Sequence, residues 1–368
     1  MKILHLVGTL NYGGIERLVT DLAIRQKIAG HAPSVCCLLR KEGGLIPVIE
    51  SEGIPVQESS YSDKAPWQLA VRLARQIKDQ NYDIIHSHVN FSLLWQVVGF
   101  LKFGRIPFII TQHTLLKMSL RKRLRSIIIY RLIKPFIKKH VAVSMYAANY
   151  AAYIYAINPD KIRVIYNGIL ANRYGFDETT RTLFREKWEI PRDAILLGSV
   201  GRLDWVKGYD VLLKAFARAR KRQGNLYLVF AGEGTLEEEL RDLARSCQCD
   251  GFIRMIGKTS NVRAVLSSCD LYIQPSRMEA LGLSILEALS NGLLTIATDV
   301  GGIKEIRQHS DNIFLVPPEN EDVLADAILR QSERIGKQGN RTSKLPEIFS
   351  FNAMFAAYES CYHEALES

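Results

Sequence analysis

The sequence predicts an α/β protein of two domains, each built around a doubly wound parallel sheet. Its 368 residues are enough for two domains, because a domain holds roughly 150 residues. Short runs rich in β-branched residues alternate with amphipathic helical stretches, the pattern of βα units around a parallel sheet. The alternation stops at a polar stretch, 168–191, and then starts again. Ligands of such sheets bind at the carboxyl ends of the strands, so we expect a site in a cleft between two domains.

Both halves of the chain are expected to contribute six strands. Helical stretches at 15–29, 66–80 and 91–103 separate the early strands, and a last one covers 351–365. We expect one domain at 1–170 and another at 171–348, followed by the segment 349–368. In chain order the expected strands are 2–7, 34–38, 83–86, 107–111, 140–143, 163–166, 194–200, 226–231, 252–256, 271–274, 293–298 and 313–316.

Composition excludes several classes of protein. The hydrophobic content of 47% argues against a disordered chain. We find no uninterrupted apolar run of about 18 residues or more, and the start of the chain lacks a basic region followed by a cleavage site. We therefore expect a cytoplasmic protein. The six cysteines are too irregularly spaced for a disulfide framework or a zinc site, and we expect reduced thiols.

One segment carries almost all of the net positive charge. Between Lys117 and Lys139 lie nine basic residues and no acidic one, interleaved with leucine and isoleucine. We interpret this segment as a basic amphipathic helix that binds an anionic membrane surface, where each cation contributes about 1 kcal/mol. The alternative is a domain helix with a solvated basic face; nucleic acid is disfavoured because no aromatic residue precedes Tyr130. The expected membrane residues are Lys117, Arg121, Lys122, Arg125, Arg131 and Lys134.

A glycine-containing loop follows the first expected strand. It runs from Gly8 to Gly14 and leads into a helix that bears Glu16. Backbone N–H groups at a helix start favour phosphate or carboxylate. The spacing is neither the dinucleotide fingerprint nor a Walker A loop. A plain tight turn would have the same sequence about as often.

The corresponding loop of the second half carries charge. Arg202 follows Gly201 at the strand end, and Lys207 stands at the helix entry. Two cations at these positions could close on a diphosphate from two sides. A pair of unit charges about 4 Å apart interacts with about 4 kcal/mol at an effective dielectric constant of 20. The alternative is two solvated cations on a surface loop.

The segment 275–289 is the most informative part of the sequence. Glu279 lies in the loop before a helix, and Glu287 lies inside that helix among leucines. A carboxylate with apolar neighbours needs a partner, and hydroxyls of a sugar or a ribose would serve, while the helix-start amides near Gly282 and Leu283 face a phosphate. A metal site is disfavoured because no Asp-x-Asp or clustered His and carboxylate set lies nearby. Glycoside hydrolysis would leave the two cations without a role.

Taken together, these motifs resemble those of family 4 retaining glycosyltransferases of the GT-B type, which have two facing Rossmann-like domains with a central cleft. The resemblance runs over nearly the whole chain in the right order. Its residues are Gly13-Gly14 with Glu16, Gly201-Arg202-Leu203 with Lys207-Gly208, Glu279 with Glu287, and Asp299-Val300-Gly301-Gly302 with Glu305.

The resemblance implies a role for each matching residue. Arg202 and Lys207 would hold the nucleotide diphosphate, and Glu279 and His113 would contact the donor sugar. The final helix would cross back to the N-terminal domain. Neither a metal nor a cofactor is implied; the co-substrate is a nucleotide diphosphate sugar, most often a UDP-sugar. The donor-binding residues expected are Gly14, Gly201, Gly282, Leu283, Ser284 and Glu287.

Three residues of the N-terminal half are candidates for the acceptor. Glu16 could position or deprotonate an acceptor, or simply complement the helix dipole. His86 and His88 could contact the acceptor, although strand alternation puts both on one face, where packed histidines are as common. The chain departs from the family at Ala280-Leu281-Gly282, where Gly-Phe-Gly is usual after the first glutamate, so the sugar is left open.

The sequence thus predicts a metal-independent retaining hexosyltransferase. Its expected acceptor is a lipid-linked saccharide or glycolipid in surface polysaccharide assembly, at the inner face of the cell membrane. The alternatives are a GT-B epimerase or phosphorylase, a transferase with a soluble acceptor, or a non-enzymatic membrane- or nucleic-acid-binding protein. No feature of the sequence indicates an oligomeric state.

Overall fold

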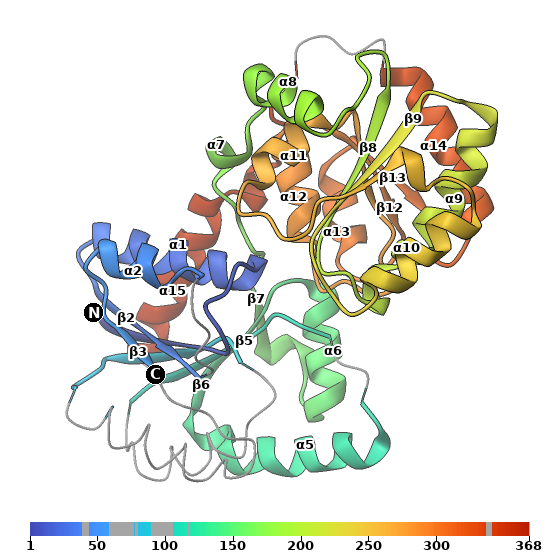
Figure 1. The fold of residues 1–368 in the computed structure, drawn as a ribbon. Helices are drawn as coiled ribbons and strands as arrows, with labels where there is room; N and C mark the ends of the chain where they lie inside the picture. The colour runs from blue at the N-terminus through green and yellow to red at the C-terminus, as the bar shows by residue number, and fades with distance from the viewer. Residues whose placement is uncertain are drawn as a thin grey trace. The chain divides into compact units, whose positions relative to one another are not determined.

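A computed structural model describes residues 1–38, 44–58, 77, 80–89, 106–115, 118–335 and 341–367. The chain divides into two compact units, Met1–Gly168 with Asn352–Ser368, and Ile169–Phe351 (Figure 1). The expected helices at 66–80 and 91–103 lie outside the described residues, apart from Ile77 and Gln80.

The first unit contains a parallel sheet of seven described strands in the order β3-β2-β1-β4-β5-β6-β7. Every residue of β4 and β5 is buried, as expected for parallel strands covered on both faces. Short β3 escaped the sequence prediction because three residues carry too little alternation to be recognised. The strands are β1 (Lys2–Val7), β2 (Ala32–Cys37), β3 (Val56–Glu58), β4 (Ile84–Ser87), β5 (Phe108–Gln112), β6 (Ile137–Ala142) and β7 (Ile162–Val164).

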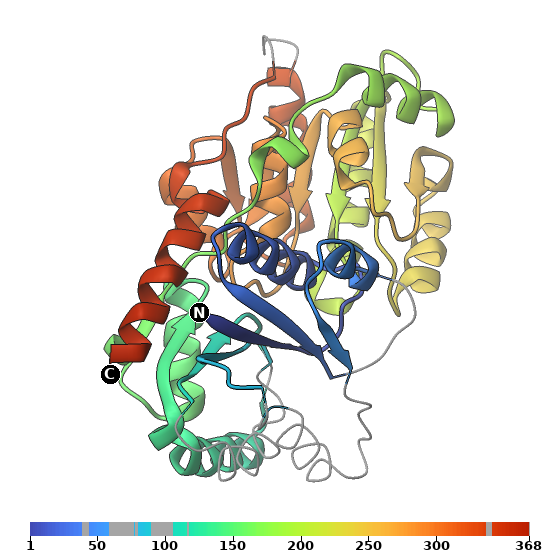
Figure 2. The ribbon, with the colours of Figure 1, turned by 90° about the vertical axis from the view of Figure 1, so that its left-hand side faces the viewer.

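The last helix of the chain packs on this first sheet. Figure 2 shows it running beside the strands of the first unit. Glu364 forms ion pairs with Lys139 and Arg163, at 2.9 and 2.6 Å, and Tyr362 reaches the buried end of β4. The described helices of this unit are α1 (Gly14–Ile28), α2 (Ile46–Ser51), α5 (Leu120–Ile133), α6 (Met145–Tyr155) and α15 (Phe351–Glu367).

The second unit repeats the architecture with six strands in the order β10-β9-β8-β11-β12-β13. Its core joins apolar strand residues to α9, with Phe216 and Phe230 both buried. The strands are β8 (Ile195–Val200), β9 (Leu226–Ala231), β10 (Ile253–Met255), β11 (Leu271–Gln274), β12 (Leu294–Thr298) and β13 (Ile313–Val316). The helices are α7 (Ala171–Tyr174), α8 (Glu178–Lys187), α9 (Tyr209–Arg222), α10 (Glu237–Ser246), α11 (Val262–Ser268), α12 (Leu283–Ser290), α13 (Ile303–His309) and α14 (Glu321–Ile335).

The basic segment is not a single helix, contrary to the sequence prediction. Helix α5 ends at Ile133, because Pro135 cannot continue it, and Lys138 and Lys139 belong to β6. Among the described residues, no helix is both long and apolar enough to span a membrane.

Candidate functional site

Both sheets reverse their strand order near the middle. The reversal falls between β1 and β4 in the first unit and between β8 and β11 in the second. Ligand sites of doubly wound folds form at such switch points, at the carboxyl ends of the strands. The loops singled out in the sequence follow these strands: residues 8–14 after β1, 201–208 after β8, and 275–282 after β11.

The structure brings Lys207 and Glu279 together across the switch point of the second sheet. The ammonium of Lys207 lies 2.8 Å from Glu279 Oε2, and the two side chains are only 19% and 15% exposed. Gly208, which links the lysine turn to α9, has a φ of +65°, and a Cβ there would lie 2.2 Å from the carbonyl oxygen of Pro275. Glycine is therefore required where the two loops meet.

Arg202 stands apart from this pair. Its side chain is 76% exposed, and its guanidinium forms an ion pair of 2.5 Å with Asp204. Because it is exposed and, among the described residues, is paired only with Asp204, this guanidinium is accessible to an anion without breaking the core. The structure thus gives the two predicted cations different surroundings.

A buried chain of hydrogen bonds holds the Glu279 carboxylate. Ser276 Oγ donates to Glu279 Oε2 over 3.1 Å, and Gln274 Nε2 donates to Ser276 Oγ over 2.6 Å. Ser284, on α12, donates to Gln274 Oε1 over 2.9 Å. Ser284 was predicted from the sequence, whereas Gln274 and Ser276 were not. The signal that could have revealed them is a glutamine at the end of an otherwise apolar strand.

The glycine pair after β12 allows a second close approach to the glutamate loop. A Cβ on Gly301 would lie 1.8 Å from the carbonyl oxygen of Glu279, and the N–H of Gly302 donates to that oxygen over 3.2 Å. Only residues without a side chain fit here. The Asp299–Gly302 motif therefore shapes the backbone under Glu279.

Arg277 fastens the lysine turn to the glutamate loop, a role that was not predicted from the sequence. Its guanidinium donates to both carboxylate oxygens of Asp210, at 2.8 and 2.7 Å, and to the carbonyl oxygen of Trp205 at 2.7 Å. It also forms an ion pair with Glu319. These acidic partners raise the pKa of Arg277, so this clamp stays charged.

The remaining donor candidates of this unit lie on or beside α12. Gly282 precedes the helix with a φ of +113°. Leu283 and Ser284 open its first turn, and half-buried Glu287 lies one turn further along. These four residues lie where the sequence motif predicts, before and within the first turns of α12. Which part of a donor each of them binds stays a prediction.

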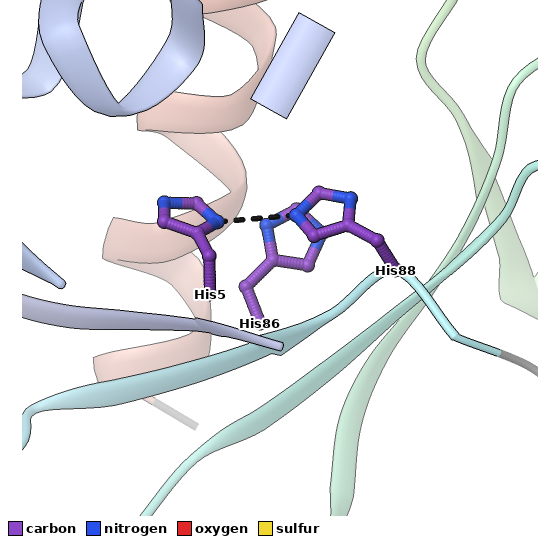
Figure 3. Close-up of side chains that lie close together, drawn as sticks. All are labelled: His5, His86 and His88. Atoms are coloured by element: carbon purple, nitrogen blue, oxygen red, sulfur yellow. Dashed lines mark hydrogen bonds between the residues drawn. The ribbon is translucent and has the colours of Figure 1, made fainter. Parts of the chain in front are cut away.

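Four histidines of the first unit lie side by side. They come from β1, from the end of β4 and from the segment after β5, and the rings of His86 and His88 are 4.0 Å apart between centroids. Figure 3 shows His5, His86 and His88 on the face of the sheet that α1 and α15 cover. His113 joins through His88, whose Nδ1 lies 2.9 Å from His113 Nε2.

Burial keeps these histidines neutral. It lowers the pKa of His5 to about 4 and that of His113 to about 3, and it lowers the pKa of His86 and His88 well below the usual value. Nitrogens of His5, His86 and His88 lie within 4.8 Å of one another, close enough to hold a metal ion. However, His5 Nδ1 and His88 Nε2 already share one hydrogen bond of 3.1 Å.

Neither His86 nor His88 offers a free nitrogen to an acceptor. The two ring nitrogens of His86 bind the hydroxyls of Tyr362 and Thr111, at 2.8 and 2.7 Å. Those of His88 bind its histidine neighbours. All four ring nitrogens thus have partners inside the first unit, and contact of these histidines with an acceptor stays a prediction.

Glu16 lies over the loop that follows β1. Its Oε1 accepts a hydrogen bond of 2.9 Å from Thr9, and its Oε2 lies 2.3 Å from the position that a Cβ on Gly13 would take. Gly14 is the first residue of α1. This half-buried carboxylate thus holds the glycine loop through Thr9.

Helix α5 presents both charge and apolar surface to solvent. Lys117 lies outside the described residues, and Lys134 opens a 3-10 turn after α5. The exposed cations of the helix are Arg121, Lys122, Arg125 and Arg131. Between them stand four large apolar side chains spaced four residues apart, which are Leu120, Leu124, Ile128 and Leu132, exposed by 68%, 52%, 61% and 61%.

Two doubly wound units with motif loops at their switch points define a GT-B type α/β protein. Residues 12–173 match the family Glycosyltransferase Family 4, and residues 180–340 match Glycosyl transferases group 1. The chain therefore belongs to the family 4 glycosyltransferases.

Relatives in sequence include two proteins named as glycosyltransferases and one named as a synthase. An uncharacterized glycosyltransferase of Methanocaldococcus jannaschii is 32% identical over 45% of this chain and 43% of its own length. N-acetyl-alpha-D-glucosaminyl L-malate synthase of Bacillus anthracis is 24% identical over 87% of this chain and 85% of its own. An O-antigen biosynthesis glycosyltransferase of Escherichia coli, WclY, is 25% identical over 80% of this chain and 83% of its own. The chain thus spans less than half the length of the first relative.

Solved structures share the fold. A glycosyltransferase from Rickettsia africae superposes with a TM-score of 0.83 at 24% identity, over 100% of this chain and 99% of that one. Anabaena Alr3699/HepE, solved in complex with UDP and glucose, superposes with a TM-score of 0.85 at 20% identity, over 99% of each chain.

Proposed function

We propose that this glycosyltransferase moves a hexose from a UDP-sugar to a hydroxyl of a lipid-linked saccharide or glycolipid, with retention at the anomeric carbon and without a metal. The observation that carries the proposal is the half-buried pair of Lys207 and Glu279 at the switch point of the second sheet. The solved complex of Anabaena Alr3699/HepE with UDP and glucose supports a uridine nucleotide as donor.

The cations would stabilise the leaving diphosphate. Lys207 is held in place by Glu279, so its ammonium is oriented before the donor binds, and exposed Arg202 would close on the other side. Preorganised charges of this kind lower the barrier most, since they need not reorganise as negative charge develops. The first amides of α12, at Leu283 and Ser284, would add hydrogen bonds to phosphate oxygens. No metal ion is needed in this scheme.

The reaction would proceed on one face of the donor sugar. The bond between the anomeric carbon and the diphosphate oxygen breaks, and the acceptor oxygen bonds to the same face of that carbon. The proton of the acceptor hydroxyl passes to an oxygen of the departing diphosphate. Glu279 and His113 would contact the sugar and Glu287 the ribose, while no protein residue serves as nucleophile.

Helix α5 supports the choice of a membrane-bound acceptor. Its exposed leucines and isoleucine can enter the interface of a bilayer while the neighbouring arginines meet anionic headgroups at the inner face of the cell membrane. The names of two relatives, an O-antigen biosynthesis glycosyltransferase and a phosphatidylinositol N-acetylglucosaminyltransferase subunit, point to the same acceptor class.

A soluble acceptor is the second candidate. It is favoured by the resemblance to the L-malate synthase, which extends over 87% of this chain. Binding of the protein to anionic vesicles separates the two candidates. If binding does not depend on anionic lipid, the soluble acceptor is preferred.

The test of the proposed function is a transfer assay with purified protein dialysed against EDTA. UDP-, GDP- and ADP-sugars are offered with a polyprenyl-diphosphate saccharide, and we expect release of UDP together with a glycosylated product whose new linkage keeps the donor anomer. Release of an epimerised free sugar without a glycosylated product would instead indicate an epimerase. Activity that appears only after addition of a divalent metal would contradict the metal-independent scheme.

A further inference from the structure

The buried histidines of the first unit form a directed chain of hydrogen bonds. Gln26 Oε1 lies 2.7 Å from His5 Nε2, and His5 Nδ1 lies 3.1 Å from His88 Nε2. His88 Nδ1 lies 2.9 Å from His113 Nε2. The chain ends at His113 Nδ1, a buried nitrogen that has no partner in the described part of the protein.

The amide of Gln26 sets the direction of this chain. A carbonyl oxygen can only accept, so His5 must carry its hydrogen on Nε2. A neutral imidazole has one N–H and one lone pair, so His5 Nδ1 accepts, and His88 must donate from Nε2. Because His88 then carries its hydrogen on Nε2, its Nδ1 accepts, and His113 must donate to it from Nε2. Burial supports the neutral state, because it lowers the pKa of His113 to about 3.

A second branch agrees with this direction. Gln26 Nε2 donates to the hydroxyl of Tyr362 over 3.3 Å, which leaves that hydroxyl free to donate to His86 Nδ1, 2.8 Å away. His86 then donates from Nε2 to Thr111 over 2.7 Å. The reversed chain would leave an N–H at His113 Nδ1 without an acceptor in the described part of the chain, and buried N–H groups without acceptors are rare in native proteins.

We propose that Gln26, His5 and His88 are positioning residues that hold His113 in a single tautomer, whose unprotonated Nδ1 accepts a hydrogen bond from a hydroxyl of the donor sugar. The proposal rests on the proposed function, in which His113 contacts that sugar. The unpartnered lone pair of His113 makes the site selective for a group that donates a hydrogen. Gln26 acts through two other rings and touches no substrate.

The unmodified protein provides the first test. Long-range proton–nitrogen correlation spectra of histidine-labelled protein report which ring nitrogen carries the hydrogen, and the eight histidines can be assigned by single substitutions. We expect the Nε2–H form at His5, His88 and His113. A hydrogen on Nδ1 of His113, or a mixture of both forms, would overturn the proposal. Loss of the Nε2 hydrogens on addition of zinc would also overturn it, because it would show that the histidines bind a metal ion.

The second test replaces the anchor of the chain. Gln26→Met keeps the length of the side chain but removes the acceptor, and we expect mixed tautomers at His113 and a KM for UDP-glucose about tenfold higher, the effect of one lost hydrogen bond. Gln26→Glu keeps an oxygen that accepts from His5 and should restore the single tautomer and the KM to within about twofold. A merely structural role for Gln26 would leave the His113 tautomer unchanged in both variants.

Controls separate this proposal from the proposed function. His140→Gln alters another buried histidine, which contacts Tyr130 rather than the chain, and should leave the His113 tautomer and the KM unchanged. If His113→Ala leaves binding of UDP-glucose unchanged, the placement of His113 at the donor sugar fails, although the spectra still decide the tautomer. If His113→Ala weakens binding but Gln26→Met does not, the positioning role of Gln26 is wrong.

Discussion

In the first unit, the ends of the central strands carry buried neutral histidines, whereas in the second unit they carry a lysine paired with a glutamate. The two sheets nevertheless share the same order around their switch points. Seven of the eight histidines of the chain lie in the first unit, and only His309 lies in the second. One architecture therefore holds neutral, hydrogen-bonded rings at the strand ends of the first unit and an ion pair at those of the second.

The different surroundings also determine how each region is held. In the second unit, the charged loops are fastened to each other by Arg277 and by close backbone contacts at glycines. In the first unit, hydrogen bonds from α1 and α15 hold the histidine rings. We therefore expect loss of a charge to reduce activity most in the second unit, and a change of protonation to reduce stability most in the first.

The largest effect is expected at Lys207. Lys207→Ala removes a preorganised cation and should lower turnover by about 10² to 10³, measured as release of UDP under saturating donor. Lys214→Ala is the matched control, because Lys214 lies on α9 and its partner is Glu321, 3.8 Å away. Both variants should unfold at similar temperatures. Near-normal turnover of Lys207→Ala would refute the charge-stabilising role of the second unit.

Acid should destabilise the first unit selectively. Burial lowers the pKa of His5 to about 4, below the usual 6.5, so between these values the unfolded chain binds a proton that the folded chain does not. Stability is then complete above about pH 6.5 and falls toward pH 4, with a slope of about 1.4 kcal/mol per pH unit for each such histidine. Burial lowers the pKa of five histidines in this unit, which are His5, His86, His88, His113 and His140.

Hydrogen exchange measured at pH 7 and pH 5, corrected for intrinsic rates, tests this expectation. Peptides from β1, β4 and β5 should lose protection at the lower pH, while those from α9 and α14 should keep it. His140→Phe should reduce the pH dependence of unfolding in the first unit. Equal loss of protection in both units would show that the histidines do not control acid stability.

Arg202 should matter less than Lys207, although both are cations of one loop. Arg202 is exposed and must give up Asp204 to reach a ligand, so we expect Arg202→Ala to raise the KM for UDP-glucose about tenfold, the effect of one charge-assisted hydrogen bond. Arg222→Ala, which removes another exposed guanidinium that pairs with Asp326, is the control. A larger loss for Arg202→Ala than for Lys207→Ala would reverse the ranking.

The smallest effect is expected on the surface of α5. Arg125→Ala should weaken binding to vesicles containing phosphatidylglycerol about fivefold, because one cation near anionic headgroups contributes about 1 kcal/mol. Arg222→Ala removes the same charge from the second unit and should not change vesicle binding. Binding to neutral phosphatidylcholine vesicles should be weak for the unsubstituted protein and for both variants. An unchanged affinity of Arg125→Ala would remove α5 from the proposed membrane surface.

The local pattern of hydrophobic and turn residues was enough to predict several strands and the two loops that bear Lys207 and Glu279. Strands β9, β11 and β13 begin and end where the sequence predicts, because buried parallel strands are uninterrupted apolar runs between turn residues. The loop that bears Lys207 and the loop that bears Glu279 were found because each lies within one short motif. Residues of one loop at the end of one strand stay close together in any doubly wound fold, because the chain itself connects them.

Tertiary structure alone decided which partners those residues have. Gln26 lies 21 positions from His5, His5 lies 83 from His88, and Gln26 lies 336 from Tyr362. These residues meet because β1, β4 and β5 are neighbours in the sheet and α15 returns to it. Hydrophobic periodicity reports whether a side chain is buried but not which group it faces, so the direction of the histidine chain and the outward face of α5 could be read only from the folded structure.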